Sequence, residues 1–327
     1  MKSHCLFLCY IILSMVPYTC GSIEVHAATE KAVPFKKNIA FLHSTHGAGG
    51  WGDDLEKALV NDFSVFPDVH LRLFEIDIDT TLSTESFKPS FPSVESGISA
   101  FSPDLIIALT DNAVEEFLNS SLKDKKIPTL VCMSQSNENH SYWGLNFAGV
   151  LFMDPMLRLY KNLRRYAKGN RLTVMSCRHA PIKTENLKVE FENVLIENVG
   201  VSSYSDFMED YQKAQTKSDA VILAFSSLPT GWDPTAANDF LMKHTSIPTG
   251  TTYQHIAPYA MITMSPSVAE TSSLITDSAL KILHGAAPSM ISPKTGGELV
   301  FIINISIAEK LGITISAPVL KTAKVIH

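Results

Sequence analysis

The sequence predicts an α/β protein made of two similar doubly wound lobes, joined by a hinge that the chain crosses several times. Apolar, strand-like runs alternate with amphipathic, helix-like runs along most of the 327 residues. One strand, helix, strand unit occurs twice, and the elements near the C-terminus suffice to add a layer to each lobe. With 45% apolar and 18% charged residues, the chain is long enough to bury two cores.

The repeated unit lies at Asp104–Gln135 and again at Asp219–Gln254. Each copy begins with an Asp before a near-continuous apolar run, passes through a polar turn and an amphipathic run, and reaches Ile-Pro-Thr at Ile127 or Ile247. A helix between two apolar strands is typical of a parallel sheet, which has both faces covered. Two copies this far apart predict two lobes of similar build.

The elements before the first copy predict half of a doubly wound domain. They are a strand at Asn38–His43, a Gly-rich turn at Ser44–Gly52, a helix at Asp53–Phe63, a strand at Val69–Ile78, and a Pro-containing loop over 79–101 that leads into a short helix.

The elements after it predict a second lobe and a return to the first. They are a polar crossover at Asn137–Gly149, a helix at Met153–Tyr166, a strand at Arg171–Ser176, a loop and helix at Ala180–Val194, a strand at Val194–Val199, a helix at Ser203–Thr216, the second copy, a strand at Tyr259–Met264, a helix at Ser267–Leu283, a strand at Leu299–Asn304 and a helix at Ile305–Leu311. We expect the first lobe to span 36–147 plus about 258–287, and the second 148–257 plus about 288–327.

The N-terminus predicts a signal peptide over residues 1–27 and a periplasmic or extracytoplasmic protein. Lys2 and His4 precede a short apolar stretch, and Val25 and Ala27 supply small side chains before a cleavage point. A retained anchor is the alternative, although the apolar stretch is shorter than the roughly 20 residues of a membrane span. Outside this leader only Cys132 and Cys177 remain, and we expect both to be core thiols.

The turn Gly47–Gly52 matches G-x-G-x-x-G between a strand and a helix, the pattern of a dinucleotide site, with Asp77 or Asp79 as its acidic partner. Trp51 and the export signal argue against a Rossmann oxidoreductase. The same turn resembles the oxyanion turn of an α/β-hydrolase, but Gly97–Phe101 comes nearest to the required G-x-S-x-G and lacks its last glycine. We therefore predict no catalytic residue and no cofactor.

His43 and His46 suggest a metal pair, but no third ligand is evident from the sequence, and ordinary polar or core histidines are the expectation. The carboxyl ends of parallel strands gather at one edge of a sheet, where open α/β proteins bind ligands. Trp51, Trp143, Trp232 and Tyr253 are available to stack on a ligand. The predicted ligand-binding residues are Thr45, His46, Trp51, Thr110, Asp111, Asn112, Ser134, Gln135, Arg178, Ser226, Ser227, Tyr253 and Gln254.

Three segments carry a resemblance to a known family. They are LVFIINISIAEKLGITISAPVLKTAKVI from Leu299, ALKILHGAAPSMI from Ala279, and WGLNFAGV from Trp143. Together with the Asp-led strands they resemble the exported substrate-binding proteins of ABC importers, with the periplasmic binding protein type 1 fold, in the branch that includes tryptophan- and tyrosine-binding members.

The resemblance implies a protein that captures a small molecule between two lobes and delivers it to a membrane permease. An amino acid or a related compound is the implied ligand. The family commonly carries Thr-Pro or Ser-Pro at Asp111-Asn112 and Asp-Pro at Gln135-Ser136, so the ligand can differ here. An extracytoplasmic sensor for a membrane signalling partner is the alternative function. We expect a monomer, and the net charge of −6 argues against binding nucleic acid.

Overall fold

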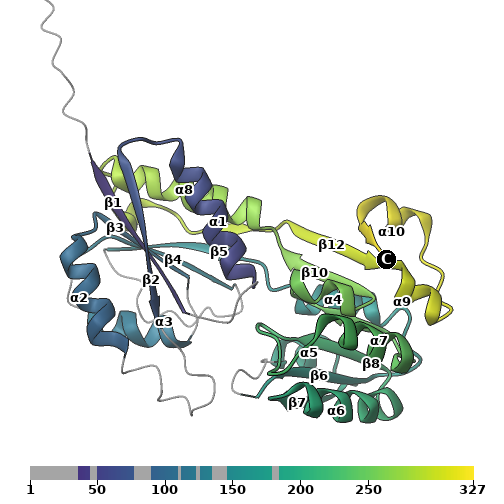
Figure 1. Cartoon of the computed structure of the whole chain (residues 1–327). Coiled ribbons are helices and arrows are strands. Elements are labelled where there is room, and N and C mark those ends of the chain that lie inside the picture. The colour runs from purple at the N-terminus through teal and green to yellow at the C-terminus, as the bar shows by residue number, and fades with distance from the viewer. Residues whose placement is uncertain are drawn as a thin grey trace, which may run out of the picture. The chain divides into compact units, whose positions relative to one another are not determined.

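A computed structural model describes residues 36–44, 50–76, 90–109, 112–122, 126–134, 146–178 and 184–327. They form two sheets with helices on both faces, which confirms the predicted fold class (Figure 1). The expected signal peptide lies outside these ranges. Within them, no helix combines the length and the apolar content that crossing a membrane requires.

The first lobe is built on a six-stranded sheet, sheet A, with the order β11-β5-β4-β3-β1-β2. Every neighbouring pair is parallel. Its strands are β1 (Lys37–Ser44), β2 (Val69–Ile76), β3 (Leu105–Leu109), β4 (Thr129–Ser134), β5 (Phe147–Phe152) and β11 (Lys294–Gly296).

The second lobe is built on a seven-stranded sheet, sheet B, with the order β13-β12-β10-β9-β8-β6-β7. Only β10 and β12 pair antiparallel. Its strands are β6 (Arg171–Cys177), β7 (Leu195–Val201), β8 (Ala220–Ala224), β9 (Thr249–Thr251), β10 (Ile262–Pro266), β12 (Leu299–Asn304) and β13 (Lys324–Ile326).

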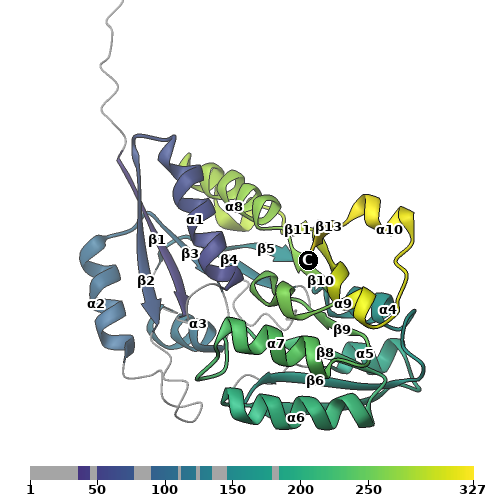
Figure 2. The same cartoon turned by 45° about the vertical axis from the view of Figure 1, so that its right-hand side comes forward.

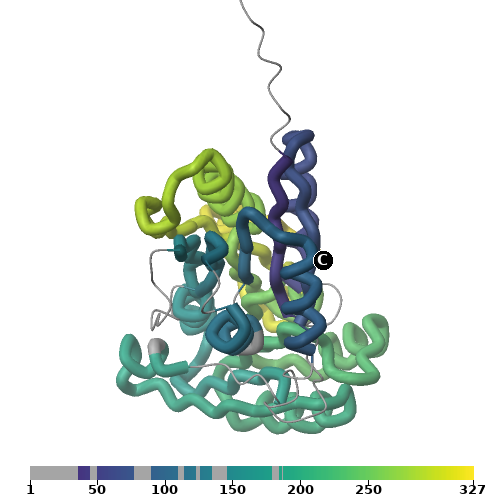
Figure 3. Tube along the Cα trace, turned by 90° about the vertical axis from the view of Figure 1, so that its left-hand side faces the viewer, coloured from purple at the N-terminus to yellow at the C-terminus, as the bar shows by residue number. Residues whose placement is uncertain are grey.

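Both faces of sheet A carry an apolar core. One core joins α1 (Trp51–Ser64) and α8 (Val268–Leu283) to alternate residues of β1, such as Ile39 and Phe41. The other joins α2 (Phe91–Phe101), α3 (Asn112–Phe117) and the π-helical turn Leu118–Leu122 to the residues in between, such as Ala40 and Leu42. Figures 1 and 3 show the light-green α8 within the lobe that is otherwise coloured purple to teal.

Sheet B is covered in the same way (Figure 2). One core contains residues of α4 (Met156–Leu163), α5 (Glu185–Glu190) and α9 (Ile305–Lys310), with α10 (Ala317–Thr322) packed at its border. The other contains α6 (Tyr204–Lys217), α7 (Pro234–His244) and the 3₁₀ turn Gln254–Tyr259. A second 3₁₀ turn, Pro288–Met290, follows α8.

The two copies of the repeated unit occupy equivalent places. The copy strands β3 and β8 each lie next to the first strand of their lobe, β1 or β6. Asp104 accepts hydrogen bonds from the backbone N–H of Asn38 (2.8 Å) and from Lys37 Nζ (2.9 Å). Asp219 does the same with the backbone N–H and the guanidinium of Arg171, at 3.0 and 3.1 Å. The leading Asp of each copy thus fastens its strand to the neighbouring one.

The chain changes sheet after β5, after β10 and after β11. The boundaries expected from the sequence, at 147/148, 257/258 and 287/288, lie a few residues earlier. At the first boundary the reason is that a polar segment leads into β5, and the chain crosses only after β5 has paired with β4. The expectation of a polar crossover up to Gly149 was accordingly wrong at its end, where β5 pairs with β4 from Phe147 onward.

Candidate functional site

Predicted site residues of the second lobe gather at one edge of sheet B. Strands β6, β8 and β9 are parallel, so their carboxyl ends lie along the same edge. The Cys177 thiol, at the end of β6, donates to the carbonyl oxygen of Ser227 (3.3 Å) and lies 3.5 Å from its Oγ. The next residue, Arg178, is exposed and donates from Nε to Ser202 Oγ at 2.8 Å. These contacts bring Arg178 and Ser227 to the same sheet edge.

Tyr253 follows β9 at this edge and borders both cores of the second lobe. Burial, together with the nearby Cys177 and Asp154, raises the pKa of its phenol to about 12. The hydroxyl is therefore a neutral hydrogen-bond donor and acceptor at physiological pH. Gln254, next in the chain, begins the 3₁₀ turn Gln254–Tyr259 and is partly exposed.

The start of α1 in the first lobe lies beside the strand ends of the second. A methyl group added to Gly50 would stand 3.4 Å from the carbonyl oxygen of Ser226, the second residue after β8. Burial lowers the pKa of the His255 imidazole, while a backbone hydrogen bond with Phe225 and the charges of Asp54 and Asp53 act in the opposite direction. Residues of both lobes therefore meet where β8 and β9 end.

Trp51 occupies the crossings between the sheets. Its indole Nε1 donates to the carbonyl oxygen of Pro266, the last residue of β10, at 3.0 Å. Its ring lies 4.7 Å from that of Phe152, the last residue of β5. Trp51 thus connects the first helix of the chain to two segments that pass between the sheets. Its predicted stacking on a ligand stays a prediction.

Trp232, which the sequence also offered for stacking, packs in the second lobe's core instead. Its ring contacts the rings of Phe207, Phe225 and Tyr259 at centroid distances between 4.9 and 6.3 Å. Tyr204 adds an edge-on contact at 5.4 Å. The aromatic spacing of this segment therefore builds the core between α6, α7 and sheet B.

Besides Trp51, the first lobe contributes two described residues to the predicted set. Ser134 ends β4 and is partly exposed, and Asn112 begins α3. The other predicted residues of this lobe, namely Thr45, His46, Thr110, Asp111 and Gln135, lie outside the described residues, and their roles stay predictions. Ser44 and Leu109, which end β1 and β3, belong to the same sheet edge as Ser134.

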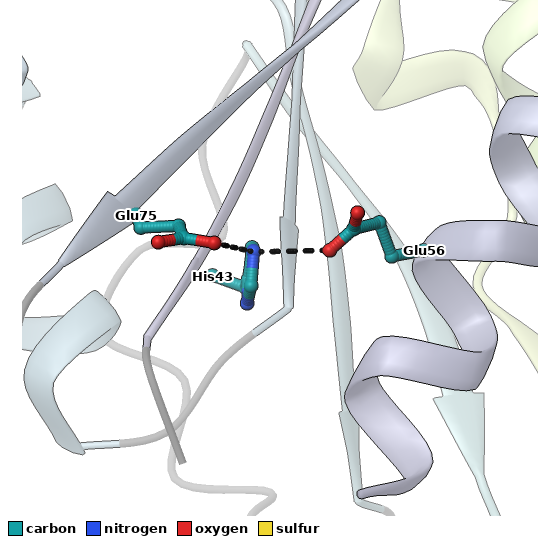
Figure 4. Close-up of side chains that lie close together, drawn as sticks. All are labelled: His43, Glu56 and Glu75. Atoms are coloured by element: carbon teal, nitrogen blue, oxygen red, sulfur yellow. Dashed lines mark ion pairs between the residues drawn. The ribbon is translucent and has the colours of Figure 1, made fainter. Parts of the chain in front are cut away.

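A cluster of three potential metal ligands lies in the first lobe, as Figure 4 shows. His43 Nε2 is 3.4 Å from Glu56 Oε2 and 3.6 Å from Glu75 Oε1. The sequence interpretation of His43 missed this cluster because its members come from β1, α1 and β2. The signal that could have found it is a polar residue near the end of each of two adjacent apolar strands.

Solved structures similar to this chain include proteins with a bound small molecule. A Streptococcus pneumonia ABC domain in complex with L-Trp is 16% identical, with a TM-score of 0.64 over 89% of this chain and 100% of that one. A ligand-free, open substrate-binding protein with adhesive properties from Clostridium difficile is 15% identical, with a TM-score of 0.60 over 89% and 99%. An ABC transporter solute-binding protein from Agrobacterium vitis with bound α-D-tagatopyranose is 13% identical, with a TM-score of 0.57 over 88% and 99%.

These similarities confirm the periplasmic binding protein type 1 fold that the sequence resemblance implied. No protein-family model matches the chain. No curated protein matches it either.

Proposed function

We propose that this chain is an extracytoplasmic solute-binding protein that holds a small polar molecule between the strand ends of its two lobes. The observation that carries the proposal is the meeting of Gly50, at the start of α1, with Ser226, after β8. Strand ends of two open α/β sheets that face one another offer backbone and side-chain hydrogen-bonding groups from both sides. Closure of the lobes by a hinge motion then removes the ligand from water.

The chemistry at the second lobe's edge favours a ligand that carries a carboxylate. Among the described residues, Arg178 donates a hydrogen bond only to Ser202, through Nε, and its terminal guanidinium nitrogens could make a fork-like contact with two oxygens of a ligand. Tyr253 and Ser227 add neutral hydroxyl groups nearby. An amino acid or a related compound meets these requirements. Asp111 is the proposed partner for its ammonium group.

Binding without chemical conversion is the proposed role, and the permease of an ABC importer is the proposed partner. The likeness to solute-binding proteins supports both, because those proteins share this fold over nearly the whole chain. The alternative partner is a membrane signalling protein. Affinity capture from native membranes distinguishes it from a permease. Recovery of a transporter permease supports import, whereas recovery of a receptor kinase supports the sensor alternative.

A thermal-shift screen tests the binding proposal. Since a ligand that binds only the folded state stabilises it by about 2.7 kcal/mol at 100 times its Kd, one compound class should raise Tm by several degrees. The panel contains amino acids, sugars, purines and organic acids. No rise with any class, together with turnover of an ester or a hydride donor, would contradict the proposal.

The variant Arg178→Ala tests the carboxylate contact. We expect it to weaken binding of a carboxylate ligand at least tenfold, since a charge-assisted bond contributes about 1.5–3 kcal/mol. Isothermal titration measures the change. Arg165→Ala, which removes an exposed arginine after α4, is the matched control and should leave the affinity unchanged. Equal affinities of wild type and Arg178→Ala would remove this residue from the site.

A further inference from the structure

The first lobe holds a cluster, His43, Glu56 and Glu75, that the proposed ligand site does not use. His43 and Glu75 are paired residues of the parallel strands β1 and β2, so both side chains leave the sheet on the same face. Ile39 and Phe41 lie on the same face of β1 as His43, because alternate residues of a strand share a face. Both pack against residues of α1, so α1 covers this face. Glu56 reaches the pair from α1 (Figure 4).

The imidazole of His43 presents its Nε2 to the two carboxylates. Its Nδ1 lies 3.2 Å from the carbonyl oxygen of Ser44, which only accepts hydrogen bonds, so Nδ1 carries the proton. In the neutral ring, Nε2 then has a lone pair and no proton. His43 is 5% exposed, and among the described residues Nε2 has no hydrogen-bond partner. A buried lone pair beside two carboxylates is electrostatically unfavourable unless a cation lies among them.

The two distances from Nε2 are longer than charge-assisted hydrogen bonds and suit neighbouring ligands of one metal ion. Hydrogen bonds from a charged nitrogen to a carboxylate are about 2.7–2.9 Å long, whereas Nε2 is 3.4 and 3.6 Å from the two oxygens. Around a tetrahedral ion with bonds of about 2.0–2.2 Å to His nitrogen and Glu oxygen, neighbouring ligand atoms lie roughly 3.3–3.6 Å apart. All three potential ligand atoms lie within 4.8 Å of one another.

We propose that His43 Nε2, Glu56 and Glu75 bind a divalent transition-metal ion of the Zn²⁺ type, which ties α1 to β1 and β2. One imidazole and two carboxylates suit Zn²⁺, and the bond from Nδ1 to a backbone carbonyl is the usual support of a metal-binding histidine. Three protein ligands leave a coordination position for water. The half-exposed Glu75 gives the ion a path from solvent.

Isothermal titration of untagged, EDTA-treated protein with ZnCl₂ tests the site. We expect one binding event, a metal-dependent rise in Tm, and visible absorption of a nitrogen- and oxygen-bound ion when Co²⁺ replaces Zn²⁺. Glu56→Gln and Glu75→Gln should each weaken Zn²⁺ binding at least tenfold, and His43→Gln should abolish it. Because the two carboxylates repel one another without metal, the Gln variants should keep or raise the metal-free Tm.

His284→Gln is the matched control, since it removes an exposed histidine of the same lobe at the end of α8. It should leave Zn²⁺ binding unchanged. Absence of Zn²⁺ and Co²⁺ binding to the wild type would overturn the proposal, as would binding that survives in Glu56→Gln and Glu75→Gln. A protonated histidine held by the two carboxylates predicts a different pattern, in which both Gln variants melt at a lower temperature and Zn²⁺ has no effect, and that pattern also overturns it.

Discussion

His255 makes the stability of the chain depend on pH at the place where the lobes meet. Burial lowers the pKa of its imidazole from the usual 6.5, against the smaller effects of Phe225, Asp54 and Asp53. The unfolded chain therefore takes up a proton near pH 6.5 that the folded chain takes up only at lower pH. Its contribution to stability is complete above about pH 6.5 and is lost as the pH falls below that value.

We accordingly expect Tm to fall as the pH decreases from 7 to 5, and the fall to be shallower in His255→Asn. Scanning calorimetry across that range measures both slopes. His284→Gln serves as the control, because its ring is exposed and its removal should leave the slope unchanged. Identical slopes for wild type and His255→Asn would show that His255 is accessible to protons in the folded state.

At the level of elements, the leading aspartates fasten each lobe's central strands. Asp104 and Asp219 each accept from the first strand's backbone N–H and pair with a neighbouring cation. The Arg171 guanidinium is about half exposed, so solvent screens its pairing with Asp219. The Arg171 side chain still lowers the pKa of the Asp219 carboxyl. The hydrogen bond from a backbone N–H of the first strand is the contact that both aspartates share.

Replacing Asp104 or Asp219 by Ala should therefore destabilise the chain by about 0.5–1.5 kcal/mol, because a backbone N–H that is not fully buried loses its acceptor. Asn, which keeps an acceptor oxygen but no charge, should cost less. Urea denaturation measures the free energy of unfolding. Asp239→Ala, on the exposed face of α7, is the control and should be near neutral. An equal loss for Asn and Ala would assign the effect to charge instead.

The sequence predicted the elements that carry a strong local pattern and missed those that depend on pairing. The two copies of the repeated unit have the same local pattern, an Asp-led apolar strand followed later by Ile-Pro-Thr. Their strands occupy equivalent places in the two sheets. Strand β5 was missed because Gly149 and a polar lead-in hide it, and the three-residue β11 exists only by pairing with β5. The cluster of His43, Glu56 and Glu75 was missed because strand register and the position of α1 bring its members together.

For the whole molecule, we propose that the strand ends of the two lobes share one ligand. Tyr253, Arg178 and Ser227 lie at one edge of sheet B, and the start of α1 meets that edge at Ser226. Trp51 contacts Phe152 and Pro266, which lie where the chain crosses between the sheets. A movement of one lobe relative to the other would therefore change the contacts of this indole. In the proposed closure, these strand ends would form the two surfaces, and the segments after β5, β10 and β11 would form the hinge.

A crystal structure grown with the compound class that raises Tm tests this claim most directly. We expect ligand density within hydrogen-bond distance of Arg178 and Tyr253 that also contacts residues of the first lobe. Density at a site away from these strand ends, or density that contacts only one lobe, would contradict it.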